Sequence, residues 1–430
     1  MNMRQINRKT TVSISLHAIP ISFIFLCTAL TGFASQTVLN IVILISCAFM
    51  LVQRTLFLAY PFMIFYAPLY GAVFGLSTYR LYSLIVLLEL LLKLQKNSFT
   101  KAKNMIPVAV YVVYALLVVA SYSVVDVAYV ILNVICCVAI TVGSLQDNPE
   151  NIRKFFKIYV LVALVAVFTG LMGRNILIGN NPVSNSLHLT RFTATFEDPN
   201  YMGFFFTIGV FAAVTLKLFK PLCRCIIVIV LYAVIMSSAS VTAVVVNILL
   251  WIVYLAVTRK INVKVGILGL VIIFLLIGLY QYGLQNPQMP IVGNISYRIN
   301  GKLMDAESGD MSSVTTGRTD LAGAHFEYFL NLPLWKQLVG GTPVNASYIS
   351  SEVYGAAHNE YIDMLLNIGL IGTMLMLWYI IQGVYSYIKV YRETKNNTQL
   401  CMLMCKCIWL AYAMTLTMFL EFRFMLPFFI

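Results

Sequence analysis

The chain has 430 residues, of which 60% are hydrophobic and only 10% are charged. An ordinary soluble domain carries roughly 25% charged residues, so this composition excludes a soluble globular fold. The net charge of +13 does not indicate a nucleic-acid-binding protein, because no basic run is longer than a short loop and none forms a domain.

The apolar residues form runs of roughly 18 or more, long enough to cross the hydrocarbon core of a bilayer as helices. They lack the alternation of barrel strands. We therefore predict an all-α, polytopic transmembrane helical bundle of about 12–13 spans, a single integral-membrane domain over residues 1–430. The predicted spans cover residues 11–30, 37–53, 55–76, 80–95, 105–122, 124–143, 155–173, 201–219, 223–239, 240–257, 264–283, 358–388 and 400–420.

The distribution of Lys and Arg predicts the orientation of these spans. With the N-terminus in the cytoplasm, the cytoplasmic side carries 21 of the 29 basic residues, as the positive-inside rule expects. Two long connections then fall outside: residues 174–200, and a large loop over 284–357 before the penultimate span. Long loops are usually functional. Within the large loop, the pattern predicts an amphipathic helix from Thr319 to Asn331.

The outer side also collects the residues that could carry chemistry. Three of the four histidines fall there, together with the arginines that the positive-inside rule does not explain. A basic residue placed against that bias calls for an anionic partner. The nine cysteines lie in or near apolar runs, and pairs such as Cys223 and Cys225 have no accompanying histidine, so we predict buried free thiols and no metal site.

The densest group of such residues is His358-Asn359, followed after nine residues by Gly369-x-x-Gly372. His358 is expected at the outer mouth of a membrane helix, where a neutral imidazole can act as a general base. Gly369 and Gly372, three apart on one face, would let another helix or a lipid chain approach closely. The alternative is that His358 and Asn359 only cap the helix at the interface.

A second group runs from Arg191 to Asp198-Pro199-Asn200, just before a predicted span. Asp198 and Asn200 are good N-cap residues, which explains them structurally. Capping does not explain Arg191, whose guanidinium can bind a diphosphate through two donors.

A third group, in the large loop, is Gly317-Arg318-Thr319-Asp320, with His325 on the same predicted helical face as Arg318. Thr319 or Asp320 could cap that helix. Arg318 could be a solvated surface charge or a phosphate ligand, and the sequence leaves both open.

These groups, taken in chain order, resemble the O-antigen ligase/polymerase family. The resemblance rests on Arg191 with Asp198-Pro199-Asn200, Gly317-Arg318, the Leu332-Pro333 and Gly340-Gly341 stretch, and His358-Asn359 with its two glycines. As topology it covers most of the chain, but the specific motifs cover only residues 190–203 and 317–372. Thirteen spans are one more than the family leads us to expect.

The resemblance implies a membrane glycosyltransferase of the bacterial cytoplasmic (inner) membrane, with its active site facing outside. Such an enzyme transfers a glycan from undecaprenyl diphosphate to an acceptor hydroxyl, with inversion and without a metal, nucleotide or other cofactor. His358 would deprotonate or orient the hydroxyl, and Asn359 would orient His358 or the sugar. Arg191 and Arg318 would hold the diphosphate and stabilise the leaving group. Asp198, Asn200, His325, Gly369 and Gly372 would support the site.

Within the family two activities compete. A polymerase joins repeat units in capsule, exopolysaccharide or O-antigen growth, with a chain-length regulator and a flippase as partners. A ligase moves the glycan to a different acceptor. We favour the polymerase, because polymerases diverge more and this chain matches only short motifs. A flippase or transporter is the rival from another class; it would carry charged residues at the membrane midplane, where this chain has almost none.

Overall fold

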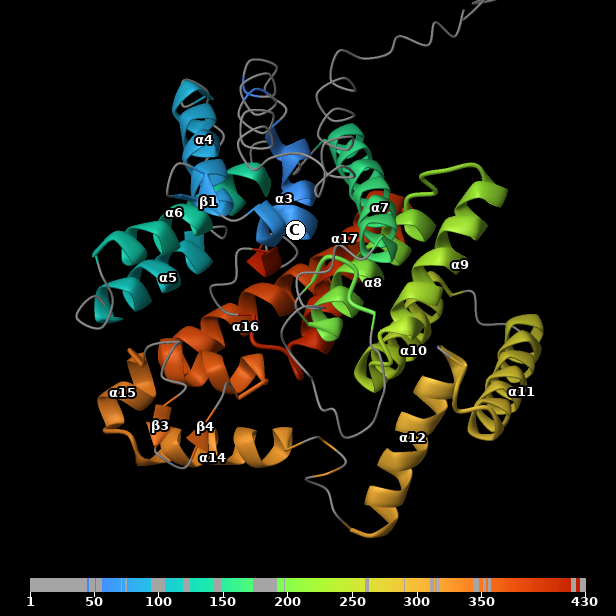
Figure 1. Cartoon of the computed structure of the whole chain (residues 1–430). Helices are drawn as coiled ribbons and strands as arrows, with labels where there is room; N and C mark the ends of the chain where they lie inside the picture. The colour runs from blue at the N-terminus through green and yellow to red at the C-terminus, as the bar shows by residue number, and fades with distance from the viewer. Residues whose placement is uncertain are drawn as a thin grey trace, which may run out of the picture.

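The computed structural model of the chain is predominantly helical (Figure 1). The structure describes residues 45, 51, 56–70, 72–73, 76–93, 105–118, 124–141, 148–172, 192–196, 198–259, 263–289, 291–309, 313, 315, 317–342, 348–350, 353–354, 357–418 and 423–425. The predicted spans over 11–30 and 37–53 therefore lie outside the described residues, except for residues 45 and 51.

The first half of the described chain consists of apolar helices and one small hairpin. Strands β1 (Ala72–Val73) and β2 (Leu76–Ser77) pair antiparallel immediately before α4. The helices are η1 (Leu56–Ala59), α3 (Tyr60–Tyr70), α4 (Thr78–Lys93), α5 (Met105–Val118), α6 (Val124–Ile140), α7 (Pro149–Leu171) and α8 (Pro199–Thr215).

The second half adds further apolar helices and the helices of the large loop. A second antiparallel pair, β3 (Tyr348–Ser350) and β4 (Val353–Tyr354), lies in that loop. The helices are α9 (Pro221–Ser237), α10 (Val241–Thr258), α11 (Val263–Gln285), α12 (Val292–Glu307), α14 (Arg318–Asn331), α15 (Leu334–Val339), α16 (Glu360–Thr394) and α17 (Asn397–Tyr412).

Several helices begin where the sequence supplies a capping side chain. The Asn148 side chain accepts a hydrogen bond at the start of α7, and Pro149 follows at the first helical position. Asp198, Ser240 and Asn396 cap α8, α10 and α17 in the same way. These caps satisfy backbone N–H groups that have no partner inside the helix.

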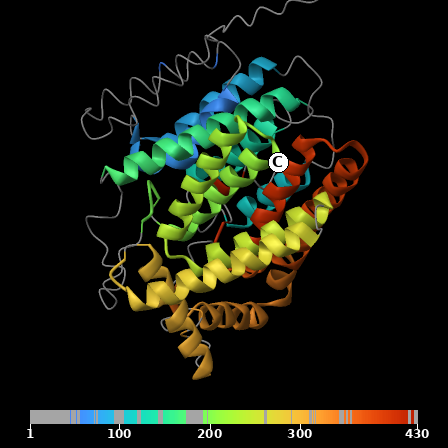
Figure 2. The ribbon, with the colours of Figure 1, turned by 90° about the vertical axis from the view of Figure 1, so that its right-hand side faces the viewer.

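Three described helices are long and apolar enough to cross a membrane: α7, α10 and α16. Shorter apolar helices, among them α8 and α9, accompany them. Many large apolar side chains point outward, for example Ile229 on α9, Leu249 on α10 and Phe274 on α11. The yellow helix α11 crosses the front of the molecule in Figure 2. Outward apolar surface of this extent suits a lipid surrounding and indicates a membrane protein. The count of thirteen spans and their orientation stay predictions.

Four of the predicted spans are compared with the helices. The apolar stretch 223–257 divides into α9 and α10 as predicted, at a turn where Ala239 has a φ of 48°. The predicted span 358–388 is the longer helix α16, interrupted at Gly369. The predicted span 400–420 was too long, because α17 ends at Tyr412 and the following residues bond to the first turn of α16 instead.

Helix α8 is the buried centre of the bundle, in contact with α7, α9, α10 and α17. Aromatic rings surround its N-terminal half. The Phe205 ring stacks on Phe196 with centroids 5.3 Å apart, and Phe65 meets Phe196 and Phe206 edge-on. Rings in these arrangements pack more favourably than their buried area alone implies.

A hydrogen-bonded network of polar side chains crosses this core. The Asn247 amide of α10 donates to the Thr207 hydroxyl of α8 (2.9 Å), which also lies 3.2 Å from the Tyr412 hydroxyl of α17. Tyr232 of α9 donates to Asn247, and the Trp251 indole donates to Tyr232. The network joins four helices, and its bonds replace those that water would otherwise supply.

The cysteine prediction is partly wrong. Of the described cysteines, all are free, but Cys223 and Cys225 are exposed at the start of α9. They lie in the first turn of α9, where residues 221–226 are all exposed or only partly buried. The described cysteines that are buried, as predicted, are Cys136, Cys137, Cys401 and Cys405.

Candidate functional site

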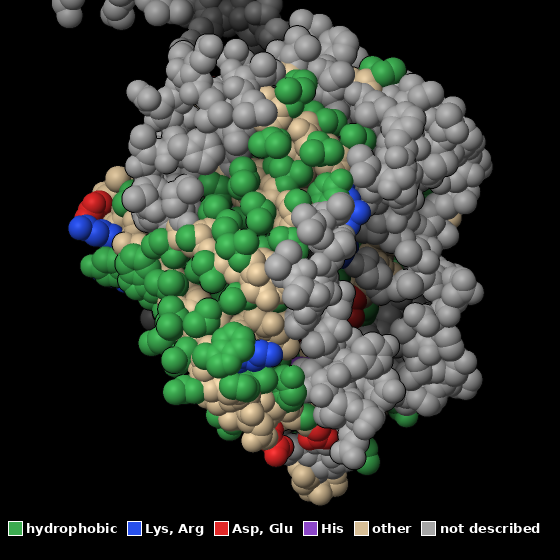
Figure 3. All heavy atoms as spheres, turned by 90° about the vertical axis from the view of Figure 1, so that its left-hand side faces the viewer, with side chains coloured by type: hydrophobic (Ala, Val, Ile, Leu, Met, Phe, Trp, Pro, Cys, Tyr) green, Lys and Arg blue, Asp and Glu red, His purple; other side chains and the backbone are tan. Residues whose placement is uncertain are grey.

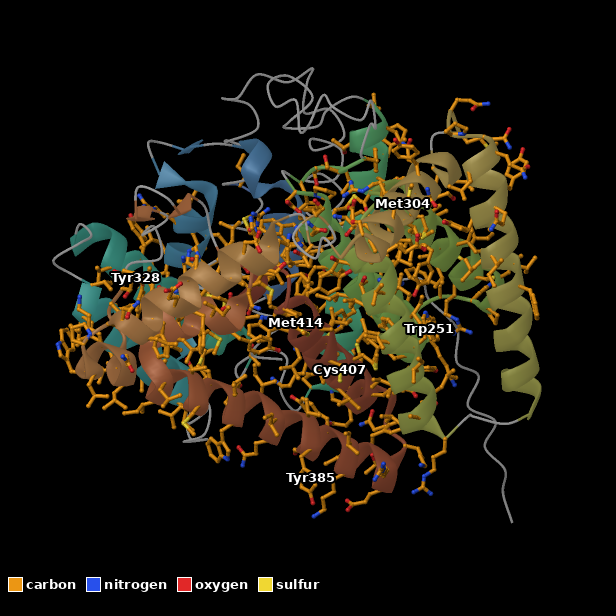
Figure 4. All side chains as sticks on the ribbon, turned by 90° about the horizontal axis from the view of Figure 1, so that it is seen from below. Trp251, Met304, Tyr328, Tyr385, Cys407 and Met414 are labelled. Atoms are coloured by element: carbon orange, nitrogen blue, oxygen red, sulfur yellow. The ribbon has the colours of Figure 1, made fainter. Side chains whose placement is uncertain are left out.

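A cavity of about 560 Å³ lies where the first turns of α8, α10 and α16 meet the loop helices α12 and α14. Five of the residues singled out from the sequence line it: Asp198, Asn200, Arg318, His358 and Asn359. Figure 4 looks at the molecule from below, and Met414 of the cavity wall lies near the centre of that view. Residues up to 217 positions apart, from Asp198 to Thr415, therefore meet at one place.

His358 and Asn359 reach the cavity because α16 begins there. Asn359 is the N-cap of α16, and its side-chain oxygen accepts hydrogen bonds from the Tyr361 and Ile362 N–H groups. His358 precedes it with a φ of 50°, in the left-handed region that is uncommon for residues other than glycine. Asn359 therefore does cap the helix, while His358 makes no cap and is placed in the cavity wall.

The surroundings of His358 keep its imidazole neutral. Burial lowers the pKa of His358 below its ordinary value, and the positive charge of Arg318 lowers it further. Asp198 raises that pKa and His325 lowers it. Both effects are smaller than those of burial and Arg318, and they oppose each other. A histidine with a lowered pKa is unprotonated at pH 7 and can accept a proton.

Asp198 and Asn200 belong to the first turn of α8, as their capping chemistry predicted. The Asp198 carboxylate accepts the Asn200 N–H at 2.6 Å. The Asn200 side chain accepts the Ser240 hydroxyl of α10, also at 2.6 Å. This pair joins the beginnings of α8 and α10 directly beneath the cavity, and Ser240 is itself a lining residue that the sequence did not single out.

Arg318 enters the cavity from the first residue of α14. Its Nη1 donates to the Thr415 carbonyl oxygen at 3.3 Å. Burial lowers its pKa, and the charge of Asp198 acts in the opposite direction. Arg318 is therefore a partly buried cation next to a cavity and not a freely solvated surface charge. That it binds phosphate stays a prediction.

The predicted cap of the loop helix was wrong in detail. The helix exists, as Arg318–Asn331, but its N-cap is Gly317 with a φ of 75° and no side-chain hydrogen bond. Thr319 instead meets the Thr315 hydroxyl, which also accepts the Thr319 N–H. Asp320 lies in the first turn of the helix, where a negative charge favours the helix dipole.

Two further cations line the cavity. Both were predicted to lie on the outer side, but neither was assigned to the site. Arg298 and Lys302 lie four residues apart on α12, so both point to the same side of that helix. Burial and the charge of Arg318 lower the pKa of Arg298. Lys302 also donates to the Ser313 carbonyl oxygen. The available signal was their spacing on an amphipathic stretch of the outer loop.

The segment after α17, residues 413–418, forms a strap along one wall. The Glu360 N–H donates to the Ala413 carbonyl (2.7 Å), and the Glu360 carboxylate accepts the Met418 N–H. The Thr417 hydroxyl donates to Asp363 at 2.7 Å. Both carboxylates are buried, and neither lines the cavity. Because Arg318 bonds to the strap, these acids link Arg318 to the helix that carries His358.

The two glycines of α16 do not act as predicted. Gly369 has a φ of 66° and a ψ of −178°, so it breaks the helix instead of sharing one face with Gly372. The loop after α15 fills the break: Gly341 N–H donates to the Asn367 carbonyl (2.9 Å). A Cβ on Gly369 would lie 2.5 Å from the Gly340 nitrogen, and a Cβ on Gly340 would lie 2.5 Å from the Gly369 nitrogen. The close approach of the two backbones therefore requires glycine at both Gly340 and Gly369.

Gly372 and His325 occupy supporting positions. A Cβ on Gly372 would meet the Ile368 side chain of its own helix at 2.7 Å, on account of the break between them. His325 is 3% exposed on α14, and its Nδ1 lies 2.8 Å from the Leu321 carbonyl oxygen. His325 does not line the cavity, but its charge acts on His358.

Arg191 lies outside the described residues. Among those described, no group of three or more His, Cys, Asp or Glu side chains is arranged to hold a metal ion. No protein-family model matches the chain, and neither does any curated protein. The function must therefore be argued from the cavity itself.

Proposed function

We propose that this chain is a membrane glycosyltransferase that polymerises undecaprenyl-diphosphate-linked oligosaccharide repeat units at the outer face of the bacterial cytoplasmic membrane. The observation that carries the proposal is the composition of one cavity. A histidine that is neutral at pH 7, His358, shares it with three cations, Arg298, Lys302 and Arg318. Among the described lining residues Asp198 is the one carboxylate, so the cavity favours an anion.

The chemistry follows from these groups. A ring nitrogen of His358 takes the proton of the acceptor hydroxyl, whose oxygen forms a bond to the anomeric carbon of the donor glycan. The bond between that carbon and the diphosphate oxygen breaks, and the electron pair leaves with the diphosphate. Arg318, Arg298 and Lys302 line the cavity together and stabilise the negative charge that develops on the leaving group. Attack from the opposite side inverts the anomeric centre.

The remaining residues hold this arrangement. Asn359 caps the helix behind His358, and Asp198 with Asn200 caps α8 beneath the cavity. The long apolar tail of a polyprenyl donor needs a lipid surrounding, which the apolar outer surface of the bundle is suited to meet. The resemblance to the O-antigen ligase/polymerase family supports the same assignment through the same residues.

The test uses purified protein in detergent with an undecaprenyl-diphosphate-linked repeat unit, and the product is resolved by chain length. We expect a ladder of longer lipid-linked glycans. His358→Ala should lower its rate of formation by about 10²–10⁴-fold, the usual contribution of a positioned general base. His17→Ala, which removes a histidine of the first predicted span, serves as the matched control and should leave the ladder intact.

Other outcomes would contradict the proposal. Transfer to a separate acceptor with no ladder would make the chain a ligase that uses the same cavity. Movement of the intact substrate across a vesicle bilayer, with no new glycosidic bond, would make it a flippase. A ladder of normal rate from His358→Ala would remove His358 from the mechanism.

A further inference from the structure

A shelf of exposed apolar side chains lies on the loop helices α14 and α15, residues 318–339. Phe326 and Leu330 are four residues apart on α14, and Leu330 is 55% exposed. On the six-residue helix α15, Leu334 is 70% and Trp335 is 56% exposed, and no residue is buried. Exposure of so many large apolar side chains to water is unfavourable, so a partner must cover them.

The shelf is held firmly, so this exposure is a fixed property of the fold. Gln337 Nε2 donates to the Leu330 and Leu332 carbonyl oxygens, both at 2.8 Å, and closes the turn between α14 and α15. Beyond α15, the Thr342 N–H donates to the Leu366 carbonyl of α16 at 3.2 Å. His325 and Phe329 are buried on the adjacent side of α14, and the Phe329 ring stacks against the Phe326 ring with centroids 6.2 Å apart.

The exposed side of the shelf continues into apolar surface of the predicted spans. α15 packs at the break in α16, and just past that break Ile371 and Met374 are exposed. A Cβ on Gly341 would lie 3.4 Å from the Leu117 side chain, near the exposed end of α5. Figure 3 shows hydrophobic side chains over a broad area of this face. The shelf therefore lies next to the exposed apolar side chains of α5 and α16, which suit contact with lipid.

The residues of α15 also suit the boundary between acyl chains and headgroups. Trp335 carries a large apolar ring with one N–H donor, the combination enriched at that depth. The Lys336 ammonium lies 5.5 Å from the centre of the Trp335 ring, on a long apolar stem that can reach a headgroup phosphate.

We propose that the shelf is inserted in the outer leaflet, with α15 lying in the plane of the interface and Lys336 at the level of the lipid phosphates. The partner is the lipid bilayer itself. This contact sets the depth of the Gly340-Gly341 loop in the bilayer. Because the Gly341 N–H donates to the Asn367 carbonyl oxygen, it also sets the depth of the short first part of α16, which follows His358. The inference does not depend on the reaction proposed for the cavity.

Fluorescence quenching of Trp335 tests the proposal. The chain has four tryptophans, so Trp251, Trp378 and Trp409 are replaced by Phe and the full-length protein is reconstituted in phosphatidylcholine and phosphatidylglycerol vesicles. Lipids brominated near the headgroup end of the acyl chain should quench Trp335 more than lipids brominated near the terminal methyl. Aqueous acrylamide should quench it weakly.

A matched variant keeps Trp378 as the sole tryptophan. Trp378 is exposed on α16 well past the break, so it should be quenched more by the deeper bromines. Should the triple replacement fold poorly, the same quenching is measured on the wild-type protein and on Trp335→Phe. The difference between the two isolates the Trp335 signal.

Two results would overturn the proposal. Strong acrylamide quenching of Trp335 without quenching by either brominated lipid would place the shelf in water. Protection from both quenchers, together with dimers after chemical cross-linking, would mean that a second copy of the chain covers it.

Discussion

The floor and the roof of the cavity are built differently. The floor is formed by the first turns of α8 and α10, where Asn200 and Ser240 bond to each other above the Thr207–Asn247 pair of the core. The roof is formed by α12 and α14, which present the cations Arg298, Lys302 and Arg318. Polar groups of the floor are satisfied by one another, whereas the charges of the roof gather around open space.

This difference separates two kinds of contribution. Removing one partner from a buried hydrogen-bonded network leaves the other unsatisfied, which costs stability. Removing a cation from a cavity relieves repulsion among like charges and costs little stability, but it removes charge that an anionic ligand needs. Substitutions in the floor should therefore change folding, and substitutions in the roof should change activity.

Among substitutions in the roof and the floor, the largest expected effect is at Arg318 in the roof. Arg318→Ala should lower the rate of glycan transfer by about 10²–10³-fold, as removal of one preorganised donor usually does. Arg318→Lys should lose less, because it keeps the charge but not the two-pronged geometry. The measurement is initial rate against substrate concentration, with the thermal midpoint as a control. A normal rate for Arg318→Ala at an unchanged midpoint would contradict the role of the roof.

The link between roof and helix α16 is tested at Glu360. Glu360→Leu leaves the Met418 N–H without its acceptor and should loosen the strap that holds Arg318, lowering transfer about tenfold. Glu360→Gln can still accept that bond and should restore most of the rate. The same Leu substitution should cost much less in an Arg318→Ala background, since the two act through one contact. Additive losses would mean that Glu360 acts independently of Arg318.

The floor is tested at Asn247. Asn247→Leu removes bonds to Thr207 and Tyr232 and should lower the unfolding free energy by about 1–2 kcal/mol. The rate per folded molecule should change little, because Asn247 does not line the cavity. Denaturation in detergent and transfer assays on the same sample measure both quantities. A lost rate with intact stability would show that the network serves the reaction.

The smallest expected effect is a shift in pH dependence at Asp198. Asn caps helices as well as Asp, so Asp198→Asn should leave α8 intact. Asp198 raises the pKa of His358, so its loss should lower that pKa further. His358 acts unprotonated, and activity falls as pH drops through its pKa; the acid side of the profile should therefore move to lower pH. A move to higher pH would contradict the assignment.

The sequence predicted several parts of the structure because they depend on local patterns. The division of residues 223–257 into two helices, the cap at Asp198 and the loop helix ending at Asn331 all follow from short-range chemistry. Grouping His358, Arg318 and Asp198 in one site was also predicted, but through a resemblance and not through spacing. Contacts between distant segments leave no periodic signal.

The errors have the same origin. The predicted span 400–420 was apolar throughout, yet its helix stops at Tyr412 because buried carboxylates of α16 offer partners to the strap. Gly369 was predicted to lie in a regular helix. Its φ of 66° breaks the helix, and the backbone of the Gly340-Gly341 loop packs against the break. In both cases a segment far along the chain overrode the local preference.

The sequence by itself determined that this is a membrane protein of apolar helices with polar, basic loops, because hydrophobicity and charge act residue by residue. Tertiary structure alone decided which basic residues share a cavity, since Arg298 and Lys302 line the same cavity as His358 through the packing of α12 against α9, α10 and α11. It also decided that the carboxylates after His358 hold a strap. Those outcomes depend on where whole helices lie, and no local pattern records that.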